Sequence, residues 1–365
     1  MTPMTAPTTA RYFVPGPTWV RPEILQELTR PMIGHRSNEF KDLFRRINAD
    51  LKTLFNTTQS TFVVTASGTG VMQAALENCV ARRVLVTTCG AFSERWYNIG
   101  ESLGYEVDRQ DADWGKAIDP EELSEHLARH QRAHYDAVTI THNETSTGVT
   151  NDIPALIEVI RDEAPDALIL IDSVSSLGGI PVEFDQWGAD VCLASVQKAI
   201  ALPPGVTVVA VSDKALERAK KHPYRGTYFD FLNYKKNADD DSVPSTPSIP
   251  HFYALAAQLD HIIRGEGLDA RYERHRRMRE ITHERTARFA KLAADPQHAS
   301  ATVTALTPII PAATIRAEMK NRGFTLGGGY GQWADTTFRI GHMGDIPIAD
   351  LEAMLDALEE VARGA

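Results

Sequence analysis

Short apolar runs alternate with longer segments of helical periodicity through the middle of the chain. Runs such as LILI at 168–171 and VTVVAV at 206–211 are typical of strands that are covered on both faces. The pattern predicts strands, the last of them weaker, at Phe62–Thr65, Val84–Thr88, Ala137–Thr141, Leu168–Asp172, Asp190–Ala194, Val206–Val211 and Tyr105–Val107. It predicts helices between them at Gly70–Ala81, Ser93–Leu103, Pro120–His130 and Pro154–Glu163. This alternation favours an α/β fold built on a mostly parallel sheet.

The alternation breaks after Ser212. Residues 222–250 contain four prolines and the acidic run Asp239–Asp241, so we expect an irregular connection there. Beyond it the pattern predicts a helix from Pro250 to about Arg264 and a longer, charged helix over Leu268–Ala293. The second helix contains the basic run RYERHRRMRE. We expect this run to form an exposed helix face, because the chain as a whole is acidic.

Shorter strands and helices are expected from 300 to 365. The last segment, LEAMLDALEEVAR, has the periodicity of an amphipathic helix. This change of rhythm predicts a smaller C-terminal α/β domain, with the long charged helix as its bridge to the rest. We expect three parts, namely an N-terminal arm over 1–19, a large domain over 20–255 and a small domain over 256–365.

Composition narrows the class of protein. The chain has 365 residues, of which 43% are hydrophobic, and this is enough for a sizeable core. No apolar run approaches the ~18–20 residues that cross a bilayer, and the N-terminal stretch lacks the features of a signal peptide. Cys79, Cys89 and Cys192 are too few and too scattered for a disulfide framework or a metal cluster. With a net charge of −10, we expect a soluble cytoplasmic enzyme with no metal, no nucleic-acid partner and no membrane anchor.

Polar residues follow the ends of several predicted strands. They lie in the segments 66–70, 89–90, 142–145, 172–173 and 195–198. In open α/β sheets, ligands bind outside the carboxyl ends of the strands, so we expect these residues to meet along one edge. The sequence therefore predicts one main site at this edge.

The first of these segments, Ala-Ser-Gly-Thr-Gly at 66–70, joins a strand to a helix that begins near Thr69. The first turn of a helix presents unpaired N–H groups and a positive end, which suits a phosphate. A dinucleotide fingerprint is incomplete, because Gln73 stands where its third glycine would be, and no Gly-Lys-Ser or Gly-Lys-Thr follows as in a P-loop. A turn that uses small residues for its geometry alone is the alternative.

Asp172 ends one buried apolar strand, and Lys198 follows the next one, just before Pro203-Pro204-Gly205. Burial lowers the pKa of a lysine and makes its amine nucleophilic. Ser195 and Lys198 also match the Ser-x-x-Lys pattern of serine acyl-enzymes, but the partner motifs of that class are absent from the sequence. Together with the phosphate turn, the acid and the lysine indicate pyridoxal phosphate. Its aldehyde forms a Schiff base with a lysine, and its ring nitrogen pairs with an acid.

Longer motifs carry a resemblance to a known family. The chain contains PGPT at 15–18, SGTG at 67–70, THNETSTGV at 141–149, IDSVSSLGG at 171–179, SVQKAIALPPG at 195–205 and FRIGHMG at 338–344. With these motifs it resembles the class V aminotransferases of fold type I, and within them the alanine–glyoxylate/serine–pyruvate aminotransferase group. The resemblance covers nearly the whole chain. It implies a mostly parallel seven-stranded sheet with flanking helices, a smaller C-terminal α/β domain and pyridoxal 5'-phosphate as cofactor.

The resemblance also implies roles for individual residues. Lys198 would carry the cofactor and move the proton during transamination, and Asp172 would pair with the ring nitrogen. Thr145 would bond the phenolic oxygen of the ring. Phe92 would stack on the ring face, with Trp96 as the competing candidate.

The phosphate is expected to contact both subunits of a dimer. The residues implied to hold it within one subunit are Thr69, Gly70, the Val71 amide and Gln197. Thr246 matches a threonine that reaches the phosphate of the other subunit, which implies a homodimer with composite active sites. The chain departs from the family at Val71, where some members carry histidine, and at Val243, where an aromatic hydroxyl is frequent.

Substrate-binding candidates lie in three other segments. Arg339 would clamp the substrate α-carboxylate bidentately, unless it is a surface arginine of an edge strand. Gly16 belongs to the N-terminal motif. The pair His35-Arg36 resembles the phosphate grip of phosphoserine aminotransferases or forms a structural pair at the dimer interface. We expect the glycine-rich segment Gly327–Gly331 to be a flexible lid.

The expected function is transfer of an amino group from alanine or serine to a 2-oxo acid such as glyoxylate or pyruvate. The alternative is a phosphoserine aminotransferase, with His35-Arg36 binding the phosphate. A lyase of the cysteine-desulfurase type would need a nucleophilic cysteine on a mobile loop, and none lies in 320–345. A non-catalytic module that only binds the cofactor would be favoured if Lys198 or Asp172 were missing, and both are present.

Overall fold

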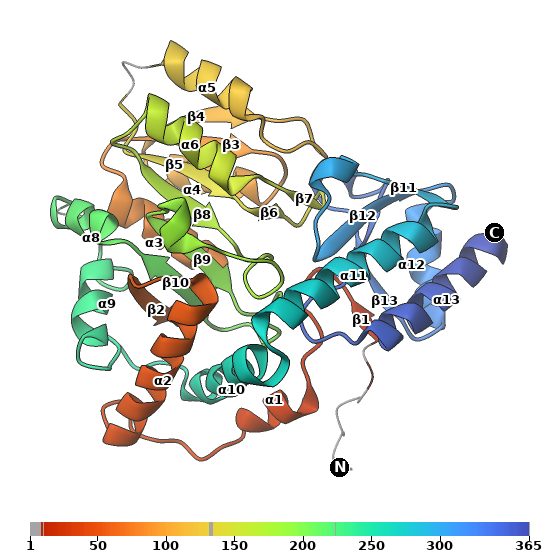
Figure 1. Cartoon of the computed structure of the whole chain (residues 1–365), viewed down its shortest axis with the longest axis horizontal. Coiled ribbons are helices and arrows are strands. Elements are labelled where there is room, and N and C mark those ends of the chain that lie inside the picture. Colours follow the sequence, from red (N-terminus) through yellow and green to blue (C-terminus); the bar gives the residue numbers. More distant parts are fainter. Residues whose placement is uncertain (1–8, 10, 131–133, 223, 365) are drawn as a thin grey trace.

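The structure is a computed structural model that describes residues 9, 11–130, 134–222 and 224–364. In this part of the chain, seven strands form a large sheet in the order β2-β10-β9-β8-β5-β3-β4 (Figure 1). Their bounds are β2 Ser60–Val64, β3 Arg83–Thr88, β4 Glu106–Asp111, β5 Ala137–Thr141, β8 Leu168–Asp172, β9 Val191–Ser195 and β10 Thr207–Val211. Neighbouring strands are parallel except around β10, which pairs antiparallel with β2 and β9. The predicted mostly parallel seven-stranded sheet is confirmed.

Helices cover both faces of this sheet, because successive strand residues point to opposite sides. In β8, Ile169 and Ile171 belong to one buried cluster, whereas Leu168 and Leu170 belong to another. The helices of the first cluster are α2 Asn38–Phe55, α5 Pro120–Arg129, α6 Ile153–Glu163 and α10 Ile249–Asp260. Those of the second are α3 Gly68–Cys79, α4 Ser93–Ser102, α8 Asp213–Lys220 and α9 Phe231–Ala238. The α/β architecture expected from the strand pattern follows from this double covering.

A second, smaller sheet has the order β1-β13-β14-β12-β11. Its bounds are β1 Tyr12–Phe13, β11 Ala290–Leu292, β12 Val303–Pro308, β13 Thr325–Gly328 and β14 Phe338–Gly341. Its apolar side packs against α11 Leu268–Thr286, α12 Ala312–Asn321 and α13 Ile348–Gly364. The N-terminal segment joins the C-terminal third of the chain, because β1 pairs in parallel with β13 (Figure 1). The domain boundaries at 19/20 and 255/256 stay predictions, and residues 1–8 and 10 of the expected arm lie outside the described residues.

Two predictions about the second half of the chain were wrong. The long charged helix ends at Thr286, and the residues expected at its end form β11, because they pair antiparallel with β12. Part of the expected irregular connection is the helix α9, which begins after an Asp230 side chain that accepts the Leu232 N–H. Phe231 and Tyr234 bury their rings in the core. The structure of β11 is determined by its pairing with β12, and that of α9 by the packing of its aromatic rings.

The basic run of α11 is also not a uniformly exposed face. Arg271 and His275 are fully buried, whereas Arg276 and Arg277 are about half exposed.

The remaining elements are α1 Pro22–Glu27, β6 Asn143–Glu144, β7 Val149–Thr150, α7 Phe184–Trp187, a π-helical turn His261–Glu266, and 3-10 turns Pro296–His298 and Gly331–Trp333. Within the described ranges, no helix has both the length and the apolar character that crossing a bilayer requires.

Candidate active site

A cavity of about 320 Å³ lies at the expected edge of the large sheet. β8 ends there at Asp172, β9 ends at Ser195, and α3 begins at Gly68 shortly after β2. The predicted site residues that line it are Gly16, Thr69, Phe92, Thr145, Asp172, Gln197 and Lys198. Arg95 and Tyr330 line it as well, although the sequence reasoning did not single them out.

Lys198 lies in the loop after β9, and its side chain is 9% exposed. Its Nζ donates a hydrogen bond to the main-chain oxygen of Pro15. Burial, followed by the nearby Arg339 cation, lowers the pKa of Lys198 to about 8. Gly16 packs against its side chain so closely that an added Cβ would lie 2.3 Å from Lys198 Cδ. A glycine is needed at position 16 because its φ is +100°, a backbone conformation that other residues rarely adopt. The lowered pKa means that the lysine amine can be neutral near pH 8.

Asp172 presents a buried carboxyl group at the end of β8. Its Oδ1 accepts the Val174 N–H at 2.8 Å. Burial raises the pKa of Asp172 to about 7, and the Val174 bond and the Lys198 charge oppose this shift only in part. A cationic ring N–H placed beside this carboxyl would supply the missing charge partner and restore the ionised form.

The start of α3 forms a small cradle. An added Cβ at Gly68 would lie 3.2 Å from Val174 Cγ2 and 3.3 Å from Ser195 Cβ, so the backbone approaches the neighbouring loops closely. Opposite it, the Ser195 hydroxyl donates to Gln197 Oε1 at 2.6 Å. The first N–H groups of a helix have no partner inside the helix, so this end suits an anion.

Two predicted phosphate contacts do not face this cradle. Gly70 and Val71 are absent from the described lining of the cavity. Their N–H groups both bond to the Ser67 oxygen, at 3.0 and 3.3 Å, and Val71 is fully buried. In this structure the described cradle therefore consists of Gly68, Thr69 and the residues opposite them.

Phe92, rather than Trp96, borders the cavity. The Lys198 Nζ lies 5.6 Å from the centroid of the Phe92 ring, whereas Trp96 is fully buried in the core. Glu144, which the sequence reasoning quoted only as part of a motif, fixes this loop. Its carboxylate accepts the N–H groups of Phe92 and Ser93, the latter at 2.8 Å, and is itself fully buried. A carboxylate at the first turn of α4 is favourable, because the N-terminal end of a helix carries a partial positive charge.

Arg339 lies on β14 beside the cavity and is not a surface residue. Its Nε donates to the Gly328 oxygen at 2.8 Å and its Nη1 to the Thr145 oxygen at 3.0 Å. Burial lowers the pKa of Arg339 to about 10, and Glu144 opposes that shift. Among the described residues its Nη2 has no hydrogen-bond partner, so this nitrogen can receive a carboxylate. The Thr145 hydroxyl bonds to the Ser175 hydroxyl at 2.8 Å.

Three predicted site residues lie away from the cavity within this chain. His35 is half-buried and Arg36 exposed, just before Ser37, which caps α2. Thr246 is exposed in the segment between α9 and α10. None of these residues belongs to the described lining of the cavity.

The glycine-rich segment is not a uniformly free loop. Gly327 and Gly328 belong to β13 and pair with β14. An added Cβ at Gly329 would lie 2.0 Å from the Trp333 oxygen, so close packing requires glycine there. Only beyond these residues does the chain turn to place Tyr330 over the cavity, 40% exposed.

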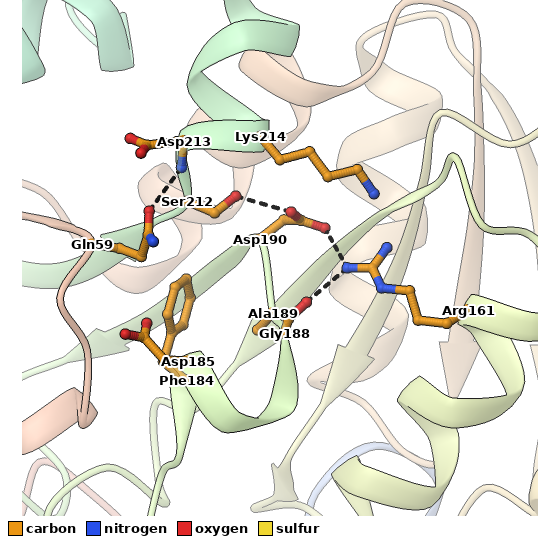
Figure 2. Close-up of a pocket in the computed structure, with 10 residues that line it drawn as sticks. All are labelled: Gln59, Arg161, Phe184, Asp185, Gly188, Ala189, Asp190, Ser212, Asp213 and Lys214. Carbon is orange, nitrogen blue, oxygen red and sulfur yellow. Dashed lines mark hydrogen bonds and ion pairs between the residues drawn. The ribbon is translucent and has the colours of Figure 1, made fainter.

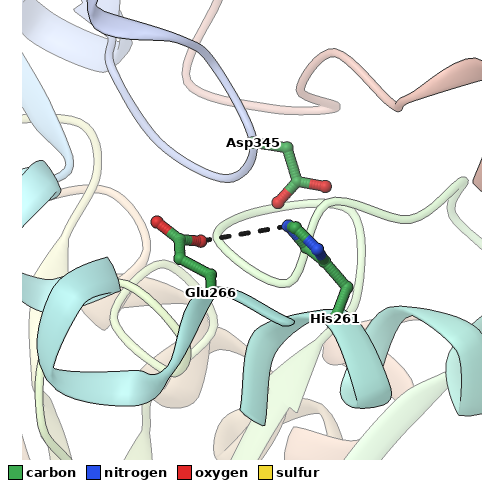
Figure 3. A group of neighbouring side chains, drawn as sticks. All are labelled: His261, Glu266 and Asp345. Carbon is green, nitrogen blue, oxygen red and sulfur yellow. Dashed lines mark ion pairs between the residues drawn. The ribbon is translucent and has the colours of Figure 1, made fainter. Parts of the chain in front are cut away.

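A second cavity and a cluster of three side chains contain none of the predicted site residues. Figure 2 shows a surface cavity of about 550 Å³, where Asp190 lies between Arg161, 2.9 Å away, and the Ser212 hydroxyl. Figure 3 shows His261, Glu266 and Asp345 grouped closely enough to hold a cation. These carboxylates already have cationic partners, because Arg271 Nη1 lies 2.8 Å from an oxygen of each. Both features are explained by structural ion pairs.

A family model and two relatives named as aminotransferases identify the same family. The model of the family "Aminotransferase class-V" matches residues 24–323. A serine–glyoxylate aminotransferase of Methylorubrum extorquens is 36% identical over 92% of this chain and 86% of its own length. A Synechococcus protein named as the small subunit of a soluble hydrogenase is 36% identical over 96% of this chain and 92% of its own. The solved structure of an alanine–glyoxylate aminotransferase from Nostoc sp. has a TM-score of 0.91 at 27% identity, with 99% of this chain and 97% of that chain covered.

Proposed function

The chain belongs to the class-V aminotransferase family, and we propose that it transfers the amino group of serine or alanine to a 2-oxo acid, glyoxylate before pyruvate, with pyridoxal 5'-phosphate as cofactor. The relatives named for serine with glyoxylate and for alanine with glyoxylate support these substrates. The observation that carries the proposal is the convergence of Lys198, Asp172 and the first turn of α3 on one cavity.

The polar groups of the cavity fit this cofactor part by part. The Lys198 amine, with its lowered pKa, suits the aldehyde, and the Asp172 carboxyl suits the ring nitrogen. The cradle at Gly68 and Thr69 suits the phosphate. Bound there, the cofactor supplies an electron sink that stabilises negative charge on the α-carbon of the substrate.

The protein residues hold the reacting groups and move the proton. Lys198 would hold the cofactor through its amine. Once free, the same amine would act as the base that takes the proton from the substrate α-carbon and delivers it to the cofactor. Asp172 would keep the ring nitrogen of the bound cofactor protonated. Phe92 covers one side of the cavity with an apolar ring and excludes water from the reacting atoms.

Arg339 is proposed to orient the substrate. Its two bonds to main-chain oxygens fix the guanidinium plane and leave Nη2 for the substrate carboxylate. The second hydrogen of Nη1 can join Nη2 in a bidentate contact with this carboxylate, and a guanidinium held in a fixed plane loses little entropy in making it. Thr145, whose main-chain oxygen accepts one of these bonds, also lines the cavity, as do Gly16 and Gln197.

We also propose a homodimer with composite active sites. Thr246, His35 and Arg36 lie away from the cavity of their own chain, which leaves them free to reach the cavity of a partner subunit. Gel filtration with light scattering tests this assembly directly.

The chain has three cysteines, Cys79, Cys89 and Cys192. All three are free and buried, which suits a reducing compartment such as the cytoplasm.

Other activities have less support. Burial raises the pKa of Cys89 and of Cys192 to about 12, and no cysteine belongs to the described lining of the cavity. The nucleophile of a desulfurase and the thiolate ligands of a hydrogenase cluster are therefore not provided there. A phosphoserine aminotransferase would need His35-Arg36 to enter the cavity from the partner.

A half-reaction screen tests the proposal. The loaded protein is mixed with alanine, serine, glutamate, phosphoserine or aminoethylphosphonate, and the colour of the cofactor is followed. We expect serine or alanine to bleach it and glyoxylate to restore it. Bleaching by phosphoserine that is lost in Arg36→Ala would instead establish the phosphoserine alternative.

A further inference from the structure

Arg95 faces the candidate active site without an acidic partner. It is the third residue of α4 and lines the cavity. Its Nη1 donates to the Thr69 hydroxyl at 2.9 Å, and its guanidinium carbon lies 4.9 Å from the centroid of the Phe92 ring. Within the described part of the chain Arg95 forms no ion pair. A full positive charge is therefore directed into the cavity and held there by a hydroxyl and an aromatic face.

The position of Arg95 next to α3 is electrostatically unusual. Thr69 is the second residue of α3, so Arg95 bonds at the helix end that carries the partial positive charge. Carboxylates are normally found at that end, yet the first turn of α3 contains no acidic residue. Two positive features that meet without an intervening anion imply that an external anion binds between them.

The Thr69 hydroxyl indicates where that anion lies. A hydroxyl has one hydrogen to donate and two lone pairs that accept. Because Thr69 Oγ1 already accepts a hydrogen bond from Arg95, its own hydrogen is free to point at a second acceptor. The hydroxyl and the guanidinium can thus donate to the same tetrahedral group, next to the first N–H groups of α3.

The other cations of the site are engaged elsewhere. The Lys198 amine bonds to Pro15 and is needed for the aldehyde. Arg339 bonds to the main chain at Gly328 and Thr145. The neutral donors near α3 do not balance a dianion, so a guanidinium is the group that this subsite requires.

We propose that Arg95 binds the phosphate group of the cofactor and supplies a full positive charge to its phosphate subsite. This inference rests on the proposed function, because the anion is the phosphate monoester of pyridoxal 5'-phosphate. Arg95 also stacks on Phe92, so one side chain connects the phosphate subsite to the residue that covers the ring.

The test measures binding rather than turnover. Cofactor-free full-length protein is titrated with pyridoxal 5'-phosphate and, separately, with pyridoxal, which lacks the phosphate, and the quenching of tryptophan fluorescence gives each Kd. The variants are Arg95→Ala and Arg95→Lys. Arg109→Ala is the matched control, because Arg109 also stacks on an aromatic residue of α4, 4.8 Å from the Tyr97 ring, but does not line the cavity.

We expect Arg95→Ala to raise the Kd for pyridoxal 5'-phosphate about 10- to 100-fold and to leave the Kd for pyridoxal within about twofold. Arg95→Lys should recover part of the loss, and Arg109→Ala should bind as the wild type does. Inorganic phosphate should compete with the cofactor in the wild type and much less in Arg95→Ala.

Equal weakening of both ligands in Arg95→Ala would overturn the inference and show that the residue only shapes the loop. Unchanged binding of both would overturn it as well. A wild-type protein that binds no pyridoxal 5'-phosphate would refute the proposed function itself, an outcome distinct from failure of Arg95 alone. Thermal unfolding of each variant without cofactor establishes that the compared proteins are folded.

Discussion

The rings of Phe92 and Tyr330 stack with their centroids 5.1 Å apart and their planes inclined by 27°. Phe92 directly precedes α4, a helix that packs on the large sheet, and Tyr330 follows β13 of the small sheet. The Arg339 guanidinium carbon lies 5.5 Å from the Tyr330 ring centroid. One aromatic pair therefore joins the two sheets across the cavity and covers the proposed position of the substrate.

Removal of the Tyr330 ring is expected to open this cover. Tyr330→Ala should lower kcat/KM for the small amino donor about 2- to 10-fold, the equivalent of an aromatic pair worth ~0.5–1.5 kcal/mol. Donors with longer side chains should gain relative to alanine. Steady-state kinetics with a series of donors measures both effects. Tyr330→Phe keeps the stack and should behave as the wild type, and a defect in it as large as that of Tyr330→Ala would contradict the proposed role of the stack.

Loss of Arg339 should act on the substrate carboxylate. We expect Arg339→Ala to lower kcat/KM by roughly 2–5 kcal/mol of binding energy, which is about 30- to 5,000-fold, chiefly through KM. Arg339→Lys keeps the charge but not the planar fork, so its kcat/KM should fall between those of the wild type and Arg339→Ala. An unchanged kcat/KM for Arg339→Ala would show that another residue binds the carboxylate.

The lowered pKa of Lys198 predicts a pH dependence of stability in the cofactor-free protein. Burial lowers this pKa from 10.5 to about 8, so between these pH values the unfolded chain binds more protons than the folded one. The free energy of unfolding therefore rises with pH across this window. Relative to Lys198→Met, the wild type should gain about 3 kcal/mol between pH 8 and 10.5. Urea unfolding at several pH values measures the difference, and parallel curves for the two proteins would disprove the shift.

Arg271 is predicted to be the most sensitive arginine of α11. It is fully buried and donates to Asp345 and to the main-chain oxygens of Gly178 and Ala199, the last of which follows Lys198. Arg271→Met leaves these acceptors buried without their donor and should cost about 3–5 kcal/mol of unfolding free energy.

Arg285 provides the control for that change on the same helix. It pairs with Asp356 and Glu359 near the surface, where an ion pair contributes up to about 1 kcal/mol. Chemical denaturation of Arg271→Met and Arg285→Met should therefore give clearly different losses. Equal losses would mean that burial of the Arg271 network contributes little.

The strand pattern predicted the large sheet well, because its strands are buried on both faces and consist of continuous apolar runs. Ala137–Thr141 and Leu168–Asp172 have the bounds that the pattern gave. β11 and α9 were missed, since long-range pairing and burial of two aromatic rings determine them. Local sequence carries neither kind of information.

The site was predicted where residues follow strand ends and missed where the fold brings distant segments together. Lys198, Asp172 and Phe92 follow from motif position. Arg95 and Tyr330 reach the cavity through the first turn of α4 and the chain after β13, and no local pattern marks Tyr330. For Arg95 the one local signal in the sequence is its position three residues after Phe92.

The central claim is that Lys198 carries the cofactor of an aminotransferase. Borohydride reduction of the loaded protein, followed by proteolysis and mass spectrometry, tests it most directly. The result expected is one modified peptide with the cofactor mass on Lys198, and loss of that label when serine or alanine is added before the reductant. A label on a different lysine, or no label on a protein that still transaminates, would contradict the claim.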